Sequence, residues 1–349
     1  MDGLVLVVSL VIILIGAELF TNGIEWLGKH FNLAEGAVGS VLAAVGTALP
    51  ETMIPLVAIV FAGGTAGAEV GIGAILGAPF MLATLAMFVT GVAVIAFRRR
   101  RVAGTRVQVD IGLLSRDARA FFVIYALAIG AAFLPADLRS FSWVVAIALV
   151  LLYAAYVRSH LHEERAVDLE DPEPLRLGRL SPTARREPDW PPHLWVVGLQ
   201  VIVALACIIV GAVFFVGAVE RVAAGFGIDG TLLALVIAPI ATELPEKFNS
   251  VLWVRLGKDN LALGNITGAM VFQAAIPPSI ALVFVPEAWV ISADTRLAFF
   301  SAAIAVGSLA VIVIPALRRG RLSAVALLTG GAFYVVYLGL VLAAMAGGS

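Results

Sequence analysis

The sequence "GTALPET" (residues 46–52) lies in the middle of a long apolar run, and "ATELPEK" (241–247) follows the same pattern in a second apolar run. Both stretches place a proline and a glutamate where a helix would cross a membrane. A charged side chain is costly at that depth, and a proline removes a helical hydrogen bond. The repetition of so costly a pattern predicts that the two stretches serve one purpose.

The composition indicates a protein built from many membrane-spanning helices. Of the 349 residues, 61% are hydrophobic and 13% are charged, and the mean hydropathy is +1.03. Soluble domains average about 45–50% apolar and about 25% charged residues. The first apolar run lacks both a basic segment and a small-residue cleavage site, so we interpret it as a retained helix rather than a signal peptide.

The residue types that most catalytic sites need are missing from the apolar runs. The histidines, at 30, 160, 162 and 193, lie in loops or at the ends of runs, and aspartate is absent from the run centres. This distribution argues against a buried histidine-based catalytic or zinc site and against an intramembrane aspartyl protease, so we do not expect an enzyme. We also expect no cofactor, no nucleic-acid partner and, without a "GxxxxGK[ST]" sequence, no ATP-driven transport by this chain alone.

The apolar segments predict an all-α polytopic membrane protein with ten transmembrane helices. Two polar stretches interrupt them: a basic one at 98–117 and a Pro- and charge-rich one at 159–193, which we interpret as a flexible linker. The predicted domains are therefore a first five-helix half (1–158), the linker, and a second five-helix half (194–349). The ten segments are 3–28, 36–62, 69–97, 118–134, 140–158, 194–219, 230–255, 260–286, 296–316 and 322–346.

The basic residues predict the orientation of these segments, because Lys and Arg gather in cytoplasmic loops. With the N-terminus outside, most of the 23 Lys and Arg residues fall in inside loops, and the linker 159–193 is cytoplasmic. We therefore expect both termini to lie outside the cell. We expect the protein itself to span the lipid bilayer of a bacterial-type plasma membrane. The sequence does not indicate an oligomeric state.

The two halves are internally similar. "LAAVGTALPE" (42–51) aligns with "IAPIATELPE" (237–246), and "GAILGAPFML" (73–82) aligns with "GNITGAMVFQ" (264–273). Because each half has five predicted spans, an odd number, the second half must enter the membrane from the opposite side. Inverted repeats with paired helix breaks are typical of secondary transporters, whose substrate site lies near the membrane midplane between the halves.

Each Leu-Pro-Glu motif offers oxygen ligands near that midplane. A proline cannot donate to the carbonyl four residues before it, which frees one backbone oxygen in each half. A kinked helix with a protonated glutamate could explain one motif alone, but two equivalent motifs favour a hard-cation cage, since Ca²⁺ takes about 6–8 oxygen ligands. The predicted donors are the Gly46 and Ala241 carbonyls, the Thr47 and Thr242 hydroxyls or carbonyls, and the Glu51 and Glu246 carboxylates.

These residues resemble the Ca²⁺/cation antiporter superfamily, which includes sodium/calcium and calcium/proton exchangers. Its α-repeats, which here would span about 36–97 and 230–286, carry a "GTSLPE"-like and a "GN-x-x-GSN-x-x-[ND]"-like motif. The resemblance implies that Glu51 and Glu246 are the paired central carboxylates, and that Asn265 and Gln273 are further ligands. The motif serines are replaced, so the sodium sites look depleted; the replacements are Ala48, Ala78, Glu243 and Ala269.

Two charged features have no equivalent in the other half. Glu243 and Lys247 are four residues apart and are predicted to pair on one helix face. The aligned positions of the first half hold Ala48 and Thr52. We hypothesise that Lys247 neutralises a second-half carboxylate and takes the place of a bound monovalent cation. This replacement favours coupling to H⁺ rather than to Na⁺. The alternative is a purely structural salt bridge. Glu18, in the middle of the first span, is expected either to line an ion path or to bond a neighbouring helix.

Together these features predict a secondary active antiporter that exchanges a divalent cation, with Ca²⁺ the first choice, for H⁺ or Na⁺ by alternating access at a midplane carboxylate site. Inorganic cations are its expected partners. The alternatives are a cation channel, in which the paired carboxylates form a selectivity ring, and an antiporter of monovalent cations only (Na⁺/H⁺).

Overall fold

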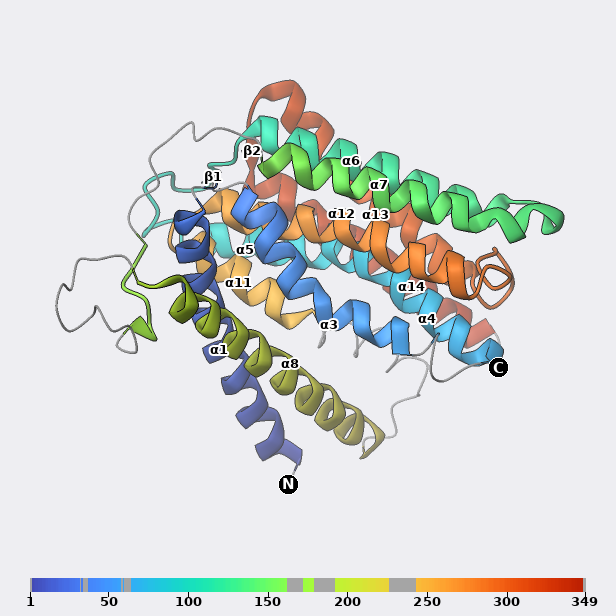
Figure 1. The fold of residues 1–349 in the computed structure, drawn as a ribbon, viewed down its shortest axis with the longest axis horizontal. Helices are drawn as coiled ribbons and strands as arrows, with labels where there is room; N and C mark the ends of the chain where they lie inside the picture. The colour runs from blue at the N-terminus through green and yellow to red at the C-terminus, as the bar shows by residue number, and fades with distance from the viewer. Residues whose placement is uncertain are drawn as a thin grey trace.

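The computed structural model describes residues 2–31, 33, 37–57, 59, 64–161, 172–178, 192–225 and 243–347. These residues are almost entirely helical, as the apolar segments predict (Figure 1). Among them, seven helices are long and apolar enough to cross a membrane. The three other predicted segments also contain helix within the described ranges, so the count of ten spans stays a prediction.

The helices follow the predicted segments in order. Those of the first half are α1 (Asp2–His30), η1 (Val38–Ala43, a π-helical turn), α3 (Ala44–Val57), α4 (Gly64–Met81), η3 (Leu82–Ala86, π-helical), α5 (Met87–Ala96), α6 (Ile111–Gly130), the 3₁₀ turns η4 (Ala131–Phe133) and η5 (Ala136–Phe141), and α7 (Ser142–Leu161). Those of the second half are α8 (Leu194–Gly225), α11 (Leu244–Arg255), α12 (Asp259–Phe284), α13 (Arg296–Arg319) and α14 (Ala324–Gly347). Two short antiparallel strands, β1 (Arg106–Val107) and β2 (Leu322–Ser323), pair Arg106 with Ser323 and Val107 with Leu322.

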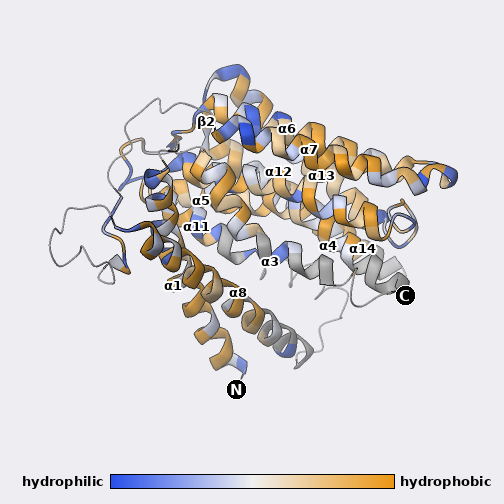
Figure 2. Cartoon of the chain, in the orientation of Figure 1, coloured by the Kyte–Doolittle hydropathy of each residue, from blue (hydrophilic) through white to orange (hydrophobic). Residues whose placement is uncertain are grey.

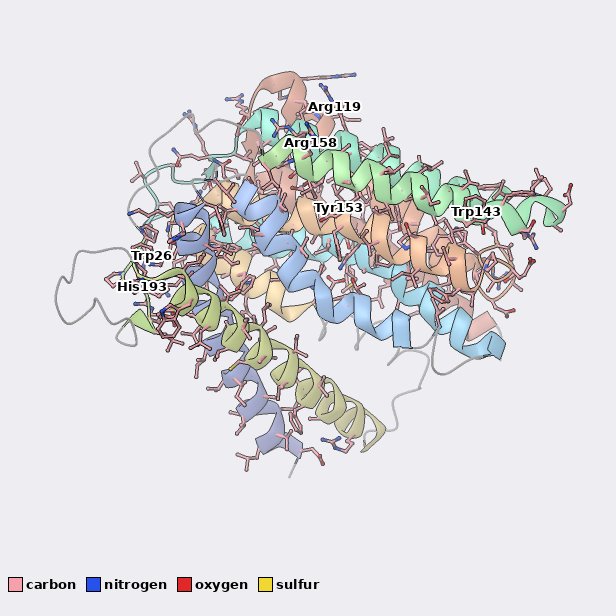
Figure 3. The ribbon with its side chains drawn as sticks, in the orientation of Figure 1. Trp26, Arg119, Trp143, Tyr153, Arg158 and His193 are labelled. Carbon is pink, nitrogen blue, oxygen red and sulfur yellow. The ribbon has the colours of Figure 1, made fainter. Side chains whose placement is uncertain are left out.

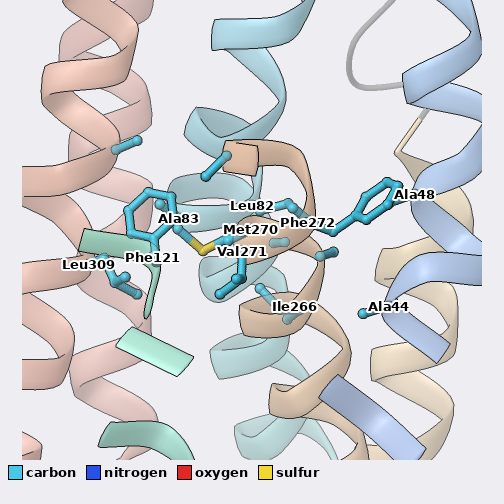
Figure 4. Close-up of a cluster of buried hydrophobic side chains, with 14 of the residues drawn as sticks. Ala44, Ala48, Leu82, Ala83, Phe121, Ile266, Met270, Val271, Phe272 and Leu309 are labelled. Atoms are coloured by element: carbon cyan, nitrogen blue, oxygen red, sulfur yellow. The ribbon is translucent and has the colours of Figure 1, made fainter. Parts of the chain in front are cut away.

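The central helix is α12. It packs against η1, α3, α4, α6, α7 and α11, and 83% of its most apolar window is buried. A helix that is apolar all round is expected in the interior of a large bundle. Figure 4 shows Phe272 of α12 directed at Ala48 of α3, and Met270 beside Phe121 of α6. The core therefore joins helices from both halves of the sequence.

The α1 and α8 helices form a separate pair beside this bundle (Figure 1). A methyl group added at Gly16 would lie 3.1 Å from the Ala204 carbonyl oxygen, and one at Gly211 would lie 3.2 Å from the Ser9 carbonyl oxygen. These two glycines have the same sequence offset as the two Leu-Pro-Glu motifs. The contact between α1 and α8 therefore uses glycines at equivalent positions of the internal repeat.

The outer surfaces of the helices are apolar along most of their length, and hydrophilic residues gather at helix ends and connections (Figure 2). Large exposed apolar side chains occur on α1, α7 and α8; examples are Val11, Ile147 and Ile202, with exposed fractions of 48%, 50% and 67%. Lipid tails can cover such side chains, so this surface fits a membrane protein.

The polar stretch predicted at 98–117 ends earlier than expected. The α6 helix begins at Ile111, where the Asp110 carboxylate accepts a hydrogen bond from the Gly112 backbone N–H at 2.7 Å. This N-cap satisfies a backbone donor that the first helical turn leaves unpaired. Asp117 therefore lies inside α6 and is fully buried, not in a loop as predicted.

One buried and one partly exposed ion pair fix the turn between α11 and α12. The Arg101 guanidinium donates to both carboxylate oxygens of Asp259, at 2.6 and 2.5 Å, and to the Val254 carbonyl at 2.6 Å. Lys258 donates to Glu25 of α1 at 2.6 Å. Because bidentate Arg–carboxylate pairs hold a defined geometry, the start of α12 is anchored to the first half of the chain.

Residues 172–178 of the predicted flexible linker dock onto α1 and α8. The Trp26 indole N–H donates to the Glu173 carbonyl at 2.9 Å, and the Leu177 N–H donates to Gln200 Oε1 at 2.8 Å. For these seven residues the prediction of a flexible segment is wrong, because side chains of both helices bind the linker backbone. Linker residues 162–171 and 179–191 lie outside the described residues.

Candidate cation site

The first Leu-Pro-Glu motif lies in α3, and Thr47, just before it, meets α12. Thr47 is fully buried, and its Oγ1 lies within hydrogen-bonding distance of Asn265 Oδ1 (3.2 Å) and of the Ala43 carbonyl oxygen (3.1 Å). Thr47 and Asn265 are 218 residues apart in sequence and come from opposite halves. The structure therefore brings together two residues that the sequence analysis placed at one site.

The segment η1–α3 runs in the same direction as α12 (Figure 1). Ser40 of η1 lies against Gly264 and Gly268 of α12, and Thr47 lies beside Asn265. Glu51 is one turn beyond Thr47 on α3, and Gln273 is about two turns beyond Asn265 on α12. Both side chains are buried, with exposed fractions of 8% and 1%.

The amide groups at this contact have unused hydrogen-bonding capacity. Within the described part of the chain, neither Nε2 nor Oε1 of Gln273 has a hydrogen-bond partner, and Nδ2 of Asn265 has none. Buried amide groups are nearly always hydrogen-bonded in folded proteins. A ligand or water beside these two residues of α12 would satisfy these atoms.

Gly46 serves the packing of α1 against α3. A methyl group at Gly46 would lie 2.7 Å from the Phe20 ring of α1 and 3.6 Å from Leu205 of α8. Only glycine leaves room for Phe20, which is fully buried. The role of the Gly46 carbonyl as an ion ligand stays a prediction.

The second motif begins α11. Pro245 lies in the first turn of this helix, a position where its missing N–H removes no helical hydrogen bond. Lys247 Nζ lies 3.0 Å from Glu243 Oε2, and both side chains are buried. The predicted pairing of Glu243 with Lys247 is confirmed, and it places a protein cation beside a buried carboxylate.

Three predicted ligands of the second half cannot be placed. Ala241 and Thr242 lie outside the described residues, and so does the side chain of Glu246, although its backbone belongs to α11. Their roles therefore stay predictions.

Glu18 of α1 pairs with the linker, and whether it lines an ion path stays a prediction. Its side chain is 60% exposed, and Oε1 lies 3.1 Å from the Arg176 guanidinium of the docked linker segment. The position of a residue along a helix does not reveal which face it occupies, so the sequence could not identify this partner. The partner of Glu18 is therefore Arg176 of the linker, and not a neighbouring helix.

Sequence reasoning also missed two buried ionisable residues, Asp117 and His160, both fully buried. Arg116 and Arg119 flank Asp117, so the segment was interpreted as a loop. His160 lies in the last turn of α7, at the end of a predicted span, where burial was not expected. The signal that could have placed Asp117 is the pattern "GLLSRDARAFF", in which apolar residues recur at helical spacing on both sides of the charges.

Comparisons with known proteins identify the family and the fold of the chain. The family model described as "Sodium/calcium exchanger protein" matches residues 2–159 and 196–345. The "Putative antiporter CaxA" of Alkalimonas amylolytica is 22% identical over 337 residues, which cover 95% of each chain. The "Uncharacterized membrane protein MJ0091" of Methanocaldococcus jannaschii is 22% identical over 268 residues, 75% of this chain and 74% of that protein.

Solved structures of similar fold include the sodium-calcium exchanger NCX_Mj. One structure, soaked with Na⁺ and Ca²⁺, has a TM-score of 0.71 at 17% identity and covers 97% of both chains. Another, soaked with neither ion, has a TM-score of 0.69 at 18% identity and covers 97% of this chain and 98% of that one. At this level of identity the likeness concerns the fold.

Proposed function

Because the chain belongs to the sodium/calcium exchanger protein family, we propose that it is a secondary active cation antiporter that exchanges Ca²⁺ for H⁺ or Na⁺. The family match covers nearly all of both halves, and a relative that spans 95% of the chain is named as a putative antiporter. The fold shared with NCX_Mj supports the same assignment.

The observation that carries the proposal is the buried contact between Thr47 and Asn265. It joins the two halves of the chain, and Glu51 and Gln273, on the same two helices, are buried as well. Oxygen atoms from carboxylate, hydroxyl and amide groups are the ligands that Ca²⁺ prefers. In the proposed site Glu51 and Glu246 bind Ca²⁺ or its exchange partner, with Thr47, Thr242, Asn265, Gln273 and the carbonyls of Gly46 and Ala241 as the remaining ligands.

The Glu243–Lys247 pair supports H⁺ rather than Na⁺ as the exchange partner. A lysine ammonium 3.0 Å from a buried carboxylate supplies the positive charge that a bound Na⁺ would otherwise bring. Ala48, Ala78 and Ala269 stand where the superfamily's motif serines would contribute to sodium sites. A site with fewer hydroxyls and a fixed ammonium is poorer in ligands for Na⁺.

The proposed mechanism is alternating access around this site. Ten helices in two inverted halves would place it near the membrane midplane, with both termini outside and the linker 159–193 in the cytoplasm. The separate α1–α8 pair would move against the bundle built around α12 and open the site to one side at a time. Ca²⁺ and its exchange partner would compete for the same oxygens, which couples the two fluxes.

Transport by the purified protein in liposomes tests the proposal. Uptake of radioactive Ca²⁺ is measured with an outward H⁺ gradient and, in parallel, with an outward Na⁺ gradient. The Glu51→Gln, Glu246→Gln double variant is the blank. The Glu18→Gln variant is the matched control, since it removes an exposed carboxylate outside the proposed site.

We expect the H⁺ gradient to drive Ca²⁺ uptake, and we expect Ca²⁺ inside the vesicles to accelerate that uptake. Both effects are expected to be lost in the Glu51→Gln, Glu246→Gln double variant. Uptake that Na⁺ drives equally well would assign the exchange partner to Na⁺. A Ca²⁺ flux that is not accelerated by Ca²⁺ on the opposite side of the membrane would favour a channel. Gradient-driven Na⁺/H⁺ exchange with no Ca²⁺ uptake would overturn the divalent cargo.

A further inference from the structure

An open groove between α6 and α7 shares no residue with the proposed cation site. It has a volume of about 250 Å³. The residues that line it include Arg116, Arg119 and Val123 of α6 and Leu152, Tyr156 and Ser159 of α7. Within each helix these residues are three or four positions apart, a spacing that places side chains on one helix face. The groove is therefore a seam between two facing stripes.

The groove has a charged end and an apolar end. Arg116 and Arg119 belong to the early turns of α6, beside the last turns of α7. Val123 is one turn beyond Arg119 on α6, and Leu152 is one turn before Tyr156 on α7. Their side chains are 57% and 37% exposed. A molecule that fills the groove therefore meets arginines at one end and apolar side chains at the other.

The charged end lies where a membrane interface is expected. Figure 3 shows Arg119 and Arg158 at one end of the α6–α7 pair and Trp143 at the other end of α7. The helix between Trp143 and Arg158 is roughly 22 Å long at about 1.5 Å per residue, so these long side chains reach toward opposite interfaces of a hydrocarbon core about 30 Å thick. The chain next to the charged end, 98–117 and 159–193, is predicted to be cytoplasmic. We therefore expect the arginines at the level of the cytoplasmic headgroups.

Hydrogen bonds hold one wall of the groove in place. The buried Tyr156 donates its hydroxyl to Asp117 of α6 at 3.0 Å. Asp117 also accepts hydrogen bonds from Ser40 of η1 at 2.8 Å and from Thr267 of α12 at 2.5 Å. The Ser159 hydroxyl donates to the Tyr156 carbonyl at 2.7 Å. Because this wall is tied to the packed core, a ligand binds there without having to order it.

We propose that the groove binds an anionic phospholipid of the cytoplasmic leaflet. The Arg119 guanidinium donates hydrogen bonds to the phosphate, the charge of Arg116 lies beside it, and one acyl chain follows Val123 and Leu152. Arginine presents several N–H donors in one plane, which suits paired hydrogen bonds to phosphate oxygens. Basic pockets between membrane helices on the cytoplasmic side are typical binding sites for anionic lipid headgroups.

The size of the groove fits a lipid better than an enclosed soluble ligand. Pockets for drug-sized ligands have about 300–1,000 Å³ and surround most of the ligand. This groove is smaller and open, so it holds the phosphate and the first part of one acyl chain. The rest of the lipid lies on the surface of α7, where only 22% of the most apolar window of Ala136–Leu161 is buried.

General attraction between arginines and anionic lipids is the alternative, because long basic side chains near helix ends extend to the interface in many membrane proteins. It depends on charge and needs no groove. Arg119→Gln removes a charge at the groove, and Arg99→Gln removes one from the exposed turn after α5. Ala120→Phe fills the groove without changing the charge, and Ala126→Phe adds the same ring at an exposed position of α6 outside the residues that line the groove.

Native mass spectrometry of the purified protein in detergent measures the dissociation constant of the first bound lipid. Phosphatidylglycerol is the anionic probe, and phosphatidylcholine with the same acyl chains is the comparison. We expect phosphatidylglycerol to bind roughly tenfold or more tightly, and Arg119→Gln to weaken it about fivefold, since each arginine contributes about 1 kcal/mol and about 1.4 kcal/mol is tenfold. Ala120→Phe is expected to abolish the preference, and Arg99→Gln and Ala126→Phe are expected to leave it within about twofold.

Equal binding of the two lipids would overturn the proposal, and so would an Ala120→Phe variant that binds phosphatidylglycerol like the wild type. Equal losses in Arg99→Gln and Arg119→Gln would assign the binding to general charge attraction. If Ala120→Phe does not fold, Val123→Trp fills the groove from a position that is 57% exposed. Displacement of the lipid by inorganic phosphate would assign the site to a soluble anion instead. Because the measurement needs neither Ca²⁺ nor transport, its outcome is independent of the antiporter proposal.

Discussion

The two Leu-Pro-Glu motifs are nearly identical in sequence but differ in their surroundings. The first lies within α3, where Ala48 is fully buried against α12 and the Thr52 hydroxyl donates to the Ala48 carbonyl at 2.8 Å. The second begins α11, where the equivalent positions hold the Glu243–Lys247 ion pair. The positions that hold Ala48 and Thr52 in the first motif thus hold a buried charge pair in the second, which teaches that the repeat conserves the motif while each half has its own electrostatics.

The glycines that follow the motifs differ in the same way. Methyl groups added at Gly264 and Gly268 would collide with Ser40 of η1. At Gly73 and Gly77, the aligned positions of the first half, such groups would meet none of the described residues within 4 Å. Among the described residues, close approach of another helix is thus found at the glycines of the second half.

The largest effect is expected from breaking the charge pair of the second motif. Lys247→Met leaves Glu243 buried without its ammonium, which typically costs about 3–5 kcal/mol. We expect a large drop in the melting temperature of the purified protein, and recovery of most of it in Glu243→Gln, Lys247→Met. Additive losses in the double variant would contradict the pairing.

Loss of the first-motif carboxylate is expected to abolish most transport while the protein still folds. Glu51→Gln removes a charged oxygen ligand worth about 3 kcal/mol, which corresponds to roughly 100-fold in Ca²⁺ affinity at 1.4 kcal/mol per tenfold. Ca²⁺ uptake at subsaturating concentration measures the loss. Glu18→Gln is the control, and equal losses in both variants would remove Glu51 from the site.

The glycine comparison predicts an intermediate effect on stability. Gly268→Ala forces α12 away from the Ser40 carbonyl, and overpacking of this kind typically costs about 1–3 kcal/mol. Gly77→Ala is expected to change the melting temperature little. Similar shifts in the two variants would show that close helix approach does not distinguish the halves.

The smallest effect is expected at the contact between the halves. Thr47→Val keeps the shape of the side chain but removes the hydroxyl beside Asn265, and a neutral hydrogen bond contributes about 1 kcal/mol. We expect a several-fold loss of Ca²⁺ affinity with little loss of folded protein. Thr52→Val, which breaks a bond within α3 only, is the matched control. An equal loss of affinity in both variants would contradict a special role for Thr47.

Sequence reasoning predicted part of the site for local reasons. The Glu243–Lys247 pair follows from a spacing of four on a helix, and the roles given to Thr47 and Asn265 follow from the aligned motifs. It did not find contacts between residues that lie far apart in sequence. Glu18 faces Arg176 of the linker, and Asp117 is surrounded by three other helical elements.

The sequence by itself determined the all-helical membrane architecture, the positions of its helices and the two motifs, because apolar runs, prolines and glycines act over a few turns of chain. Only the tertiary structure decided that Thr47 meets Asn265, that Glu18 faces the linker, and that Asp117 and His160 form a buried pair. The physical reason is that the packing of helices distant in sequence decides which face of a helix is buried, and short-range periodicity carries little information about that choice.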